Sequence, residues 1–159
     1  MHVEIISVSE HKAAPMRAID AVALVAGKGI VGDRKYGLKR HPGQNLTLVE
    51  AEQIESFNRQ YHASLSLLDT RRNVVTRGVR LNDLVGRQFW IGEVLLRGVE
   101  LCEPCGTLAR YLAGAGGLSR PQFLRALAHR CGLRADVLSS GVIRPGASLR
   151  TDPPAGAGE

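Results

Sequence analysis

Two of the three cysteines stand at a C-x-x-C spacing, in the segment Leu101-Cys-Glu-Pro-Cys-Gly-Thr-Leu108. Cysteines at this spacing serve in thiol–disulfide exchange, in zinc binding and in the ligation of other metals. Cys105 stands where a helix is expected to begin, and the positive end of a helix dipole lowers the pKa of a thiol. Because the thiolate attacks electrophiles and binds metals, Cys105 is the first candidate for a reactive residue.

The other two cysteines suit structural roles better. Cys102 ends the apolar run 94–101 and can close a strand, although a thiol there could also form a reversible disulfide with Cys105 or resolve a persulfide. Cys131 falls near the end of an expected helix and is predicted to lie in the core. A zinc site that adds His129 to the three thiols is disfavoured, because His129 and Cys131 point to different faces of that helix. The chain also lacks the G-x-S-x-G sequence of a serine hydrolase.

Basic residues fall in two segments that are far apart in the sequence, within a net charge of +6. The first contains Lys28, Arg34, Lys35, Lys39 and Arg40, and the second contains Arg71, Arg72, Arg77 and Arg80. The two segments can be solvated loops, or they can converge on one anionic ligand. Arg71 and Arg72 are the stronger candidates, since the guanidinium fork suits phosphate recognition by paired hydrogen bonds. No nucleic-acid partner is expected, because no expected helix has a basic face and aromatic residues make up 4% of the chain.

The composition is that of an ordinary globular protein, with 44% hydrophobic and 23% charged residues among 159. No apolar run approaches the roughly 20 residues that cross a bilayer, so no membrane partner is expected. The N-terminal sequence carries an early acid and lacks the apolar block of a signal peptide. An odd number of cysteines does not make a secreted disulfide framework. These features predict a cytoplasmic protein with reduced thiols.

Short β-rich runs dominate the chain, and a few helical segments interrupt them. Strands are expected at 3–9, 18–25, 46–49, 74–76, 88–91, 94–99, 133–139 and 142–150, and helices at 50–61, 105–112 and 119–131. The glycine-rich segment 27–37 is a loop without the order of a P-loop or a dinucleotide-binding turn. We therefore predict a mainly β, β-rich α+β fold: a closed or partly closed barrel with a few peripheral helices, as one domain over 1–151. Residues 152–159 are predicted to be a disordered tail.

A series of short segments forms an ordered set along residues 27–150. They are Gly29-Ile-Val-Gly-Asp33, Arg71-Arg-Asn-Val-Val-Thr-Arg-Gly78, Leu81-Asn-Asp-Leu-Val-Gly86, Ile91-Gly92, Pro104-Cys105 and Cys131-Gly-Leu-Arg-Ala-Asp-Val137, followed by Gly141, Ile143 and Gly146. In this order they resemble the MOSC domain, a family named for the C-terminal domain of molybdenum cofactor sulfurase. The resemblance implies a MOSC-type β-barrel.

The resemblance also implies which residues act. Cys105 falls on the family's central cysteine, which ligates molybdenum in members that bind the molybdenum cofactor and carries a persulfide in sulfur-handling proposals. Arg71 and Asn73 fall on an Arg-x-Asn element associated with holding the pterin and its phosphate. Relatives often place a histidine soon after the Gly-Asp pair, where this chain has Arg34 and Lys35.

The remaining candidates would surround the same anionic pterin cofactor. Arg34, Lys35 and Arg72 are expected to join Arg71 in holding the charged tail of a molybdopterin. Asp33 is expected either to bind a ring N–H or to brace the glycine-rich loop by accepting backbone hydrogen bonds.

Three functions follow from these residues. The first is a molybdopterin-binding redox protein that reduces compounds such as N-hydroxylated substrates, with Cys105 as catalytic residue and metal ligand. It needs a separate electron-donor protein, because the sequence contains no flavin, haem or iron–sulfur motif. The second is a sulfur carrier, in which Cys105 takes sulfur as a persulfide from a sulfur-donor protein. The third is a binding module without catalysis.

Overall fold

The computed structural model describes residues 1–153 and 155–156. The strands of the larger sheet are β1 (His2–Val8), β2 (Arg17–Ala18), β5 (Leu46–Glu50), β6 (Val74–Arg77), β7 (Gln88–Ile91), β8 (Val94–Leu101), β9 (Leu133–Val137) and β11 (Leu149–Arg150). Their order is β11-β7-β8-β9-β5-β6-β1-β2. A smaller sheet contains β3 (Val22–Val25), β4 (Gly29–Ile30) and β10 (Gly141–Ile143). Paired strands are antiparallel except for β5 and β6, which run parallel.

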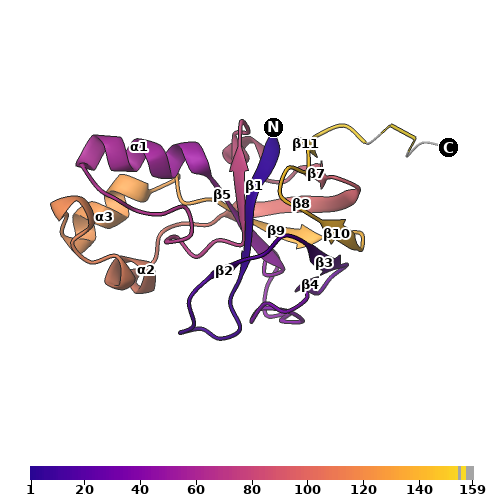
Figure 1. Ribbon diagram of the computed structural model, residues 1–159, viewed down its shortest axis with the longest axis horizontal. Helices are drawn as coiled ribbons and strands as arrows, with labels where there is room; N and C mark the ends of the chain where they lie inside the picture. Colours follow the sequence, from indigo (N-terminus) through magenta and orange to yellow (C-terminus); the bar gives the residue numbers. More distant parts are fainter. Residues whose placement is uncertain (154, 157–159) are drawn as a thin grey trace.

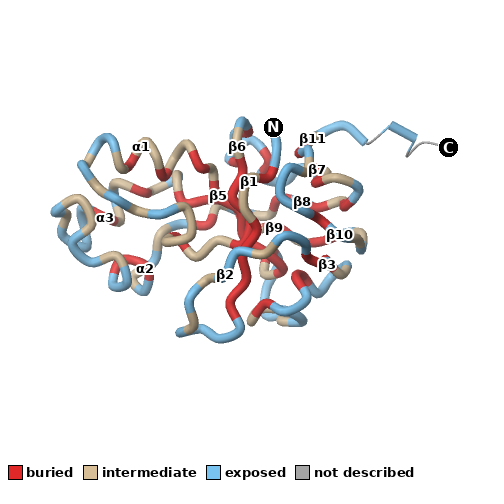
Figure 2. Tube along the Cα trace, in the orientation of Figure 1, coloured by how far each residue is buried: buried red, intermediate tan, exposed pale blue. Residues whose placement is uncertain are grey.

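The larger sheet curls into a half-barrel around an apolar core (Figure 1). Buried and more exposed positions alternate along β8, where Val94 and Leu96 are fully buried. Phe89 from β7 and Leu133 from β9 lie in the same core cluster. Buried segments therefore concentrate where the strands cross (Figure 2). This confirms the predicted β-rich α+β fold and shows that the sheet is partly closed.

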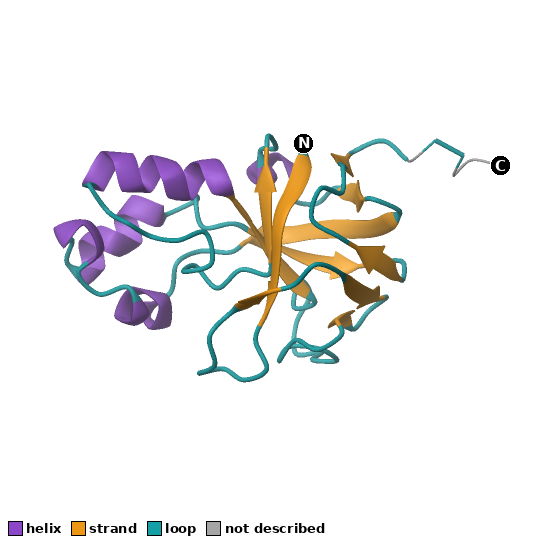
Figure 3. Cartoon of the chain, in the orientation of Figure 1, coloured by secondary structure: helices purple, strands orange, loops and turns teal. Residues whose placement is uncertain are grey.

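The helices gather at one side of the sheet (Figure 3). In the described part of the chain they are α1 (Ala51–Tyr61), α2 (Gly106–Tyr111) and α3 (Arg120–Leu127), with the 3₁₀ turn η2 (Ala115–Gly117) beside α1. The 3₁₀ turn η1 (Leu81–Leu84) contacts β5 and β8 instead. Phe57 of α1 meets Phe123 of α3 edge to face, with ring centroids 5.8 Å apart. Leu108 of α2 joins this second core. None of these helices has the length and hydrophobicity that a membrane span requires.

Two of the expected strands are wrong as single elements. The expected strand 18–25 is divided, because Ala18 pairs with Ser7 of β1 whereas Val22 pairs with Ile143 of β10. The expected strand 142–150 is divided by a turn in which Gly146 has φ of 90°. Its two halves consequently join different sheets as β10 and β11.

Two helix and loop boundaries also differ from the prediction. The helix expected to reach 131 begins with the predicted capping box of Ser119 and Gln122 but ends at Leu127. His129 then adopts a left-handed backbone with φ of 61°, and its N–H donates to the carboxylate of Glu103. Within the glycine-rich segment, β4 forms a short strand. Of the predicted tail 152–159, residues 154 and 157–159 lie outside the described residues.

Candidate functional site

Cys105 is the N-cap of α2, in agreement with the expected helix start. Its Sγ accepts a hydrogen bond from the backbone N–H of Leu108 at 3.5 Å. Partial burial opposes ionisation, but the N–H groups of Leu108 and Thr107 and the charge of Arg72 outweigh it and lower the pKa of Cys105. Cys105 is exposed, whereas the other two cysteines are buried. The site therefore presents one accessible thiol whose thiolate form is favoured.

Cys102 and Cys131 lie in the interior, as expected for structural cysteines. Burial raises the pKa of the Cys131 thiol. His129 does not join the thiols, because its Nδ1 lies 3.0 Å from Oε1 of Glu103. Within residues 1–153 and 155–156, no three His, Cys, Asp or Glu side chains are placed to hold a metal ion. These thiols thus form no zinc site in the described chain.

Arg72 connects the two chain segments that carry the buried cysteines. Its Nε donates to the carbonyl oxygen of Cys131 at 3.0 Å, and its Nη2 donates to the carbonyl oxygen of Cys102 at 3.3 Å. Nη2 also lies 3.3 Å from Sγ of Cys131. The guanidinium is therefore fixed between the end of β8 and the start of β9, where its charge acts on Cys105.

Arg71, the residue before Arg72, is held by a different set of contacts. Its backbone is left-handed, with φ of 61°. Nη2 donates to the carbonyl oxygen of Lys12 at 3.1 Å and to Oγ of Ser9 at 3.4 Å. Its guanidinium carbon lies 5.7 Å from the ring centroid of Tyr111, which is a cation–π contact. Arg71 is thus positioned by a strand end, a loop and an aromatic ring.

The structure brings the two predicted basic segments together. Burial lowers the pKa of Arg34, and the charge of Arg71 lowers it further. Burial also lowers the pKa of Lys35, and Arg34 is the largest of the charges that add to this effect. We refer to Arg34, Lys35, Arg71 and Arg72 as the basic cluster. Among the described residues, none of the four forms an ion pair with a carboxylate within 4.0 Å.

Asp33 and Asn73 lie beneath the basic cluster and are buried. Oδ1 of Asp33 accepts from Ser9 N at 3.1 Å and from Asn73 Nδ2 at 3.3 Å, while Oδ2 accepts from Lys35 N at 3.2 Å. Oδ1 of Asn73 accepts two hydrogen bonds from Thr47 at 3.2 Å each. Of the two roles that the sequence left open for Asp33, these contacts favour bracing of the glycine-rich loop. Asn73 is engaged in similar hydrogen bonds within the protein. Both side chains fix the loops that carry the cations.

The end of β1 explains why residues so distant in the sequence meet. Ser7 N donates to the carbonyl oxygen of Asn73 at 2.7 Å, and Arg34 N donates to the carbonyl oxygen of Ser9 at 2.8 Å. The segment 7–9 therefore lies between the glycine-rich loop and the residues that precede β6. Backbone hydrogen bonds of this kind bring Arg34 close to Arg71 without requiring direct pairing of their side chains.

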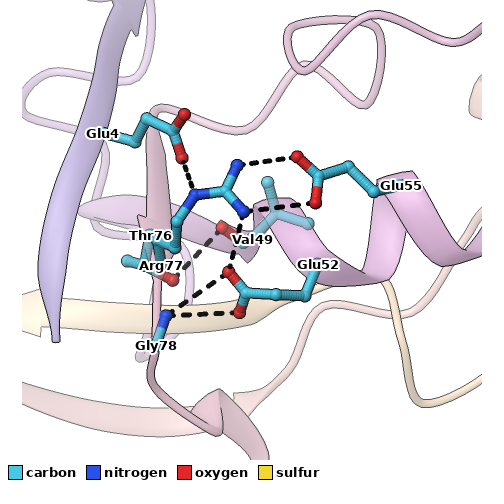
Figure 4. Close-up of polar contacts among 7 residues, drawn as sticks. All are labelled: Glu4, Val49, Glu52, Glu55, Thr76, Arg77 and Gly78. Carbon is cyan, nitrogen blue, oxygen red and sulfur yellow. Dashed lines mark hydrogen bonds and ion pairs between the residues drawn. The ribbon is translucent and has the colours of Figure 1, made fainter.

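The other predicted basic residues lie apart from the cluster. Lys39 and Arg40 line a separate cleft of about 440 Å³ beside His41 and Asp136. Arg77 is bound by glutamates, as Figure 4 shows. Arg80 is exposed and lies 3.8 Å from Asp83. Only part of each basic segment therefore contributes to the site.

Sequence reasoning missed two residues that contact the basic cluster. Tyr111 contacts Arg71, and the Sδ of Met16 lies 3.8 Å from Nη1 of Arg34. The position of Tyr111 at the end of the short helix that Cys105 caps is a signal that could have revealed it. No comparable signal marks Met16, because its contact depends on the path of the loop between β1 and β2.

The fold and this arrangement define a class of protein. The MOSC domain profile matches residues 35–150, so the chain belongs to the MOSC domain family. Among curated protein sequences there is no significant match.

Several solved structures superimpose on this chain and share its fold. The YuaD protein from Bacillus subtilis superimposes with a TM-score of 0.79 at 17% identity, over 92% of each chain. YiiM from Geobacillus stearothermophilus gives a TM-score of 0.72 at 17% identity, over 98% of this chain and 77% of that one. YiiM from Escherichia coli gives 0.68 at 17% identity, over 96% and 70%. At this identity the similarity establishes the fold.

Proposed function

We propose that this protein binds a molybdenum cofactor and catalyses two-electron redox chemistry, such as the reduction of N-hydroxylated compounds. One observation carries the proposal: the exposed thiol of Cys105 lies within reach of the charge of Arg72, which belongs to a cluster of cations without carboxylate partners in the described chain. A soft thiolate suits molybdenum, and unpaired guanidinium groups suit a phosphate. The family is associated with this cofactor, and the donor set fits it.

The residues divide into three roles in this proposal. Cys105 would hold the metal, and the basic cluster would hold the anionic tail of the pterin. Asp33 and Asn73 would keep the loops of the cluster in place. When bound, the cofactor supplies the two-electron redox change. A separate protein would supply the electrons.

A buried hydroxyl next to the cluster is compatible with a polar ligand. Thr70 immediately precedes Arg71 and is 1% exposed. Its Oγ1 forms no hydrogen bond with any of the described residues. Buried hydroxyl groups normally find a partner, so an unsatisfied one beside a proposed site is consistent with a ligand or an ordered water.

The test is the molybdenum content of the protein, measured by elemental mass spectrometry after expression in a host that makes the cofactor. We expect near-stoichiometric metal in the wild type and loss of the metal in Cys105→Ser. Arg80→Gln is the matched control, because Arg80 is exposed and lies outside the basic cluster. Absence of metal from the wild type, or unchanged metal in Cys105→Ser, would reject Cys105 as the ligand of a bound cofactor.

A sulfur carrier is the second candidate, and it is favoured by the same exposed thiol with its lowered pKa. Cys102 and Cys131 are buried, so one cysteine is accessible to a sulfur donor. After incubation with a sulfur-donor protein, mass spectrometry should find an added sulfur atom on Cys105 that is lost in Cys105→Ser. Ligand binding that persists in Cys105→Ala, with neither metal nor labile sulfur, would indicate a non-catalytic binding module.

A further inference from the structure

The chain between Glu103 and Asp136 contains no acidic residue. This segment includes Cys105, α2 and α3, and it carries five arginines and no lysine: Arg110, Arg120, Arg125, Arg130 and Arg134. By contrast, α1 on the same helical side carries Glu52 and Glu55 (Figure 1). Protein interfaces are enriched in arginine and depleted of lysine and acidic residues. The composition of this segment is therefore typical of a surface that binds another protein.

Two of these arginines are used within the fold. Nε of Arg130 donates to Oε1 of Gln53 at 2.8 Å, which connects the end of the helical segment to α1. Arg134 of β9 lies 3.6 Å from the carboxylate of Glu100. The remaining three are exposed and have no carboxylate within 4.0 Å in the described chain: Arg110, Arg120 and Arg125. Their charges are consequently available to a partner.

Arg110 and Arg120 lie on the surface that presents the reactive thiol. Nη2 of Arg120 donates to the carbonyl oxygen of Gly106, the residue after Cys105, at 3.5 Å. Arg110 and Thr107, three positions apart on α2, line one hollow of about 250 Å³, and Thr107 hydrogen-bonds to Cys105. We refer to the residues of this surface as the α2 face: Cys105, Thr107, Arg110, Tyr111 and Arg120.

Tyr111 gives the α2 face an apolar contact. Its side chain is 54% exposed, whereas Phe57 and Phe89 are fully buried. The guanidinium carbon of Arg71 lies 5.7 Å from the ring centroid, so a cation–π contact orients the ring before a partner arrives. Exposed tyrosine and arginine are the residue types that contribute most to binding energy in protein interfaces. The α2 face combines both types around one accessible thiol.

The charge of the α2 face selects among macromolecular partners. A second copy of this chain would bring the same unpaired arginines to a symmetric contact, where like charges repel. A nucleic acid is bound through many phosphates at once, and the α2 face offers two arginines and one ring. A protein surface that carries a few carboxylates beside apolar groups matches two arginines around a tyrosine. An acidic protein is therefore the partner that this face fits.

We propose that the α2 face docks an acidic protein over Cys105. Carboxylates of the partner pair with Arg110 and Arg120, and Tyr111 packs against its apolar surface. Attraction between a few exposed charges gives a fast, weak and salt-sensitive complex, which suits a partner that must leave after each encounter. The role of this partner as the donor that Cys105 requires rests on the proposed function, whereas the docking itself does not.

The experiment is a titration of the isotope-labelled full chain with a plant-type ferredoxin, a small protein whose surface is strongly acidic. Amide NMR signals report the site and the affinity. We expect micromolar binding at low ionic strength and signal changes centred on α2 and the start of α3. The affinity should fall about tenfold or more between about 20 mM and 200 mM salt. Signal changes centred on the cleft of Lys39 and Arg40, or no binding at low salt, would overturn the inference.

Charge reversal separates the α2 face from the net charge of the protein. Arg110→Glu combined with Arg120→Glu should weaken ferredoxin binding about tenfold or more. Arg87→Glu combined with Arg144→Glu is the matched control, because both arginines are exposed, lie on the sheet side and lack carboxylates within 4.0 Å in the described chain. It changes the net charge equally and should reduce the affinity about twofold or less. Equal losses in the two double variants would reject a specific docking face.

Access to Cys105 shows whether the partner covers the thiol. Saturating ferredoxin should slow alkylation of Cys105 by iodoacetamide about fivefold or more. The rate should not respond to ferredoxin in Arg110→Glu combined with Arg120→Glu, whose amide spectrum shows whether the variant is folded. Unchanged alkylation in the ferredoxin-bound wild type would contradict docking at this site. Tighter binding of a duplex or single-stranded oligonucleotide than of ferredoxin at the same salt concentration would assign the face to nucleic acid instead.

The molybdenum content of the same preparations separates this inference from the proposed function. Protein that takes up no molybdenum but binds ferredoxin through Arg110 and Arg120 would retain the docking face and reject the molybdenum cofactor. Protein that takes up molybdenum and does not bind ferredoxin would retain the proposed function and reject the docking face.

Discussion

Arg72 and Arg77 are five positions apart in the sequence and have opposite surroundings. Arg77 contacts three glutamates from two parts of the chain, Glu4 of β1 and both Glu52 and Glu55 of α1 (Figure 4). The hydrogen bonds that Arg77 donates to Glu55, and next the one that it donates to Glu4, raise the pKa of Arg77. Arg72 contacts carbonyl oxygens and a thiol. Its positive charge has no carboxylate partner within 4.0 Å in the described chain.

The comparison shows that the same residue type can be neutralised by carboxylates or can keep its charge without them. The charge of Arg77 is neutralised by glutamates that join β1, β6 and α1, so that this arginine contributes to the connection between elements. The charge of Arg72 adds to those of Arg34, Lys35 and Arg71. Because like charges repel, each of these cations disfavours the charged form of its neighbours. A folded protein that keeps such a cluster gains from an anion bound there.

The largest expected effect is on anion binding. Arg72→Gln removes one positive charge from the basic cluster, whereas Arg77→Gln leaves all four charges of the cluster in place. We expect Arg72→Gln to weaken inorganic phosphate binding about tenfold or more, because a hydrogen bond to a charged group contributes about 1.5–3 kcal/mol. Isothermal titration calorimetry measures the affinity, and Arg77→Gln should match the wild type. Equal losses in the two variants would remove the distinction between these arginines.

The second effect is on the ionisation of Cys105. Arg72 favours the thiolate, so Arg72→Gln should raise the pKa of Cys105 and slow its alkylation by iodoacetamide near neutral pH. The measurement is the pH profile of the alkylation rate, followed by mass spectrometry of the Cys105 peptide. Arg77→Gln should leave the profile unchanged. A profile that does not move in Arg72→Gln would show that the helix N–H groups alone set this pKa.

The third effect is on stability, and here Arg77 is the sensitive position. Arg77→Gln leaves three glutamates without their shared cation. We expect the free energy of unfolding to fall by about 1 kcal/mol, since partly exposed ion pairs contribute little individually. Urea denaturation measures the change. Arg80→Gln, at an exposed pair, should change stability by about 0.5 kcal/mol or less. A loss at Arg80 as large as that at Arg77 would contradict a special role for the glutamates.

The smallest effect is the pH dependence of that stability. The hydrogen bond from Arg77 lowers the pKa of Glu55 below its ordinary value of 4.5. The unfolded state then binds more protons, so the contribution of Glu55 is present above pH 4.5 and is lost as the pH falls through the lower folded pKa. The stability difference between wild type and Arg77→Gln should therefore shrink on acidification. A difference that grows in urea titrations at acid pH would contradict this sign.

Local sequence patterns predicted several features because neighbouring residues determine them. The capping box of Ser119 and Gln122 forms as expected, and Cys105 begins a helix. The hairpin of β7 and β8 also lies where alternation and Gly92 place it. Chain segments that change partners were harder to predict. Ala18 and Val22 both belong to β-forming runs, and only the pairing of each with a distant strand shows that they lie in different sheets.

The sequence by itself determined the family, a cysteine at a helix start and the two sets of basic residues. Tertiary structure decided which cations meet. Ser9 connects the loop of Arg34 to the segment of Arg71, and these contacts depend on hydrogen bonds between residues far apart in the chain. It also decided that Arg77 receives glutamates while Arg72 does not. The physical reason is that the residue type sets the charge of a side chain, whereas its exposure and its counterions depend on which parts of the folded chain pack around it.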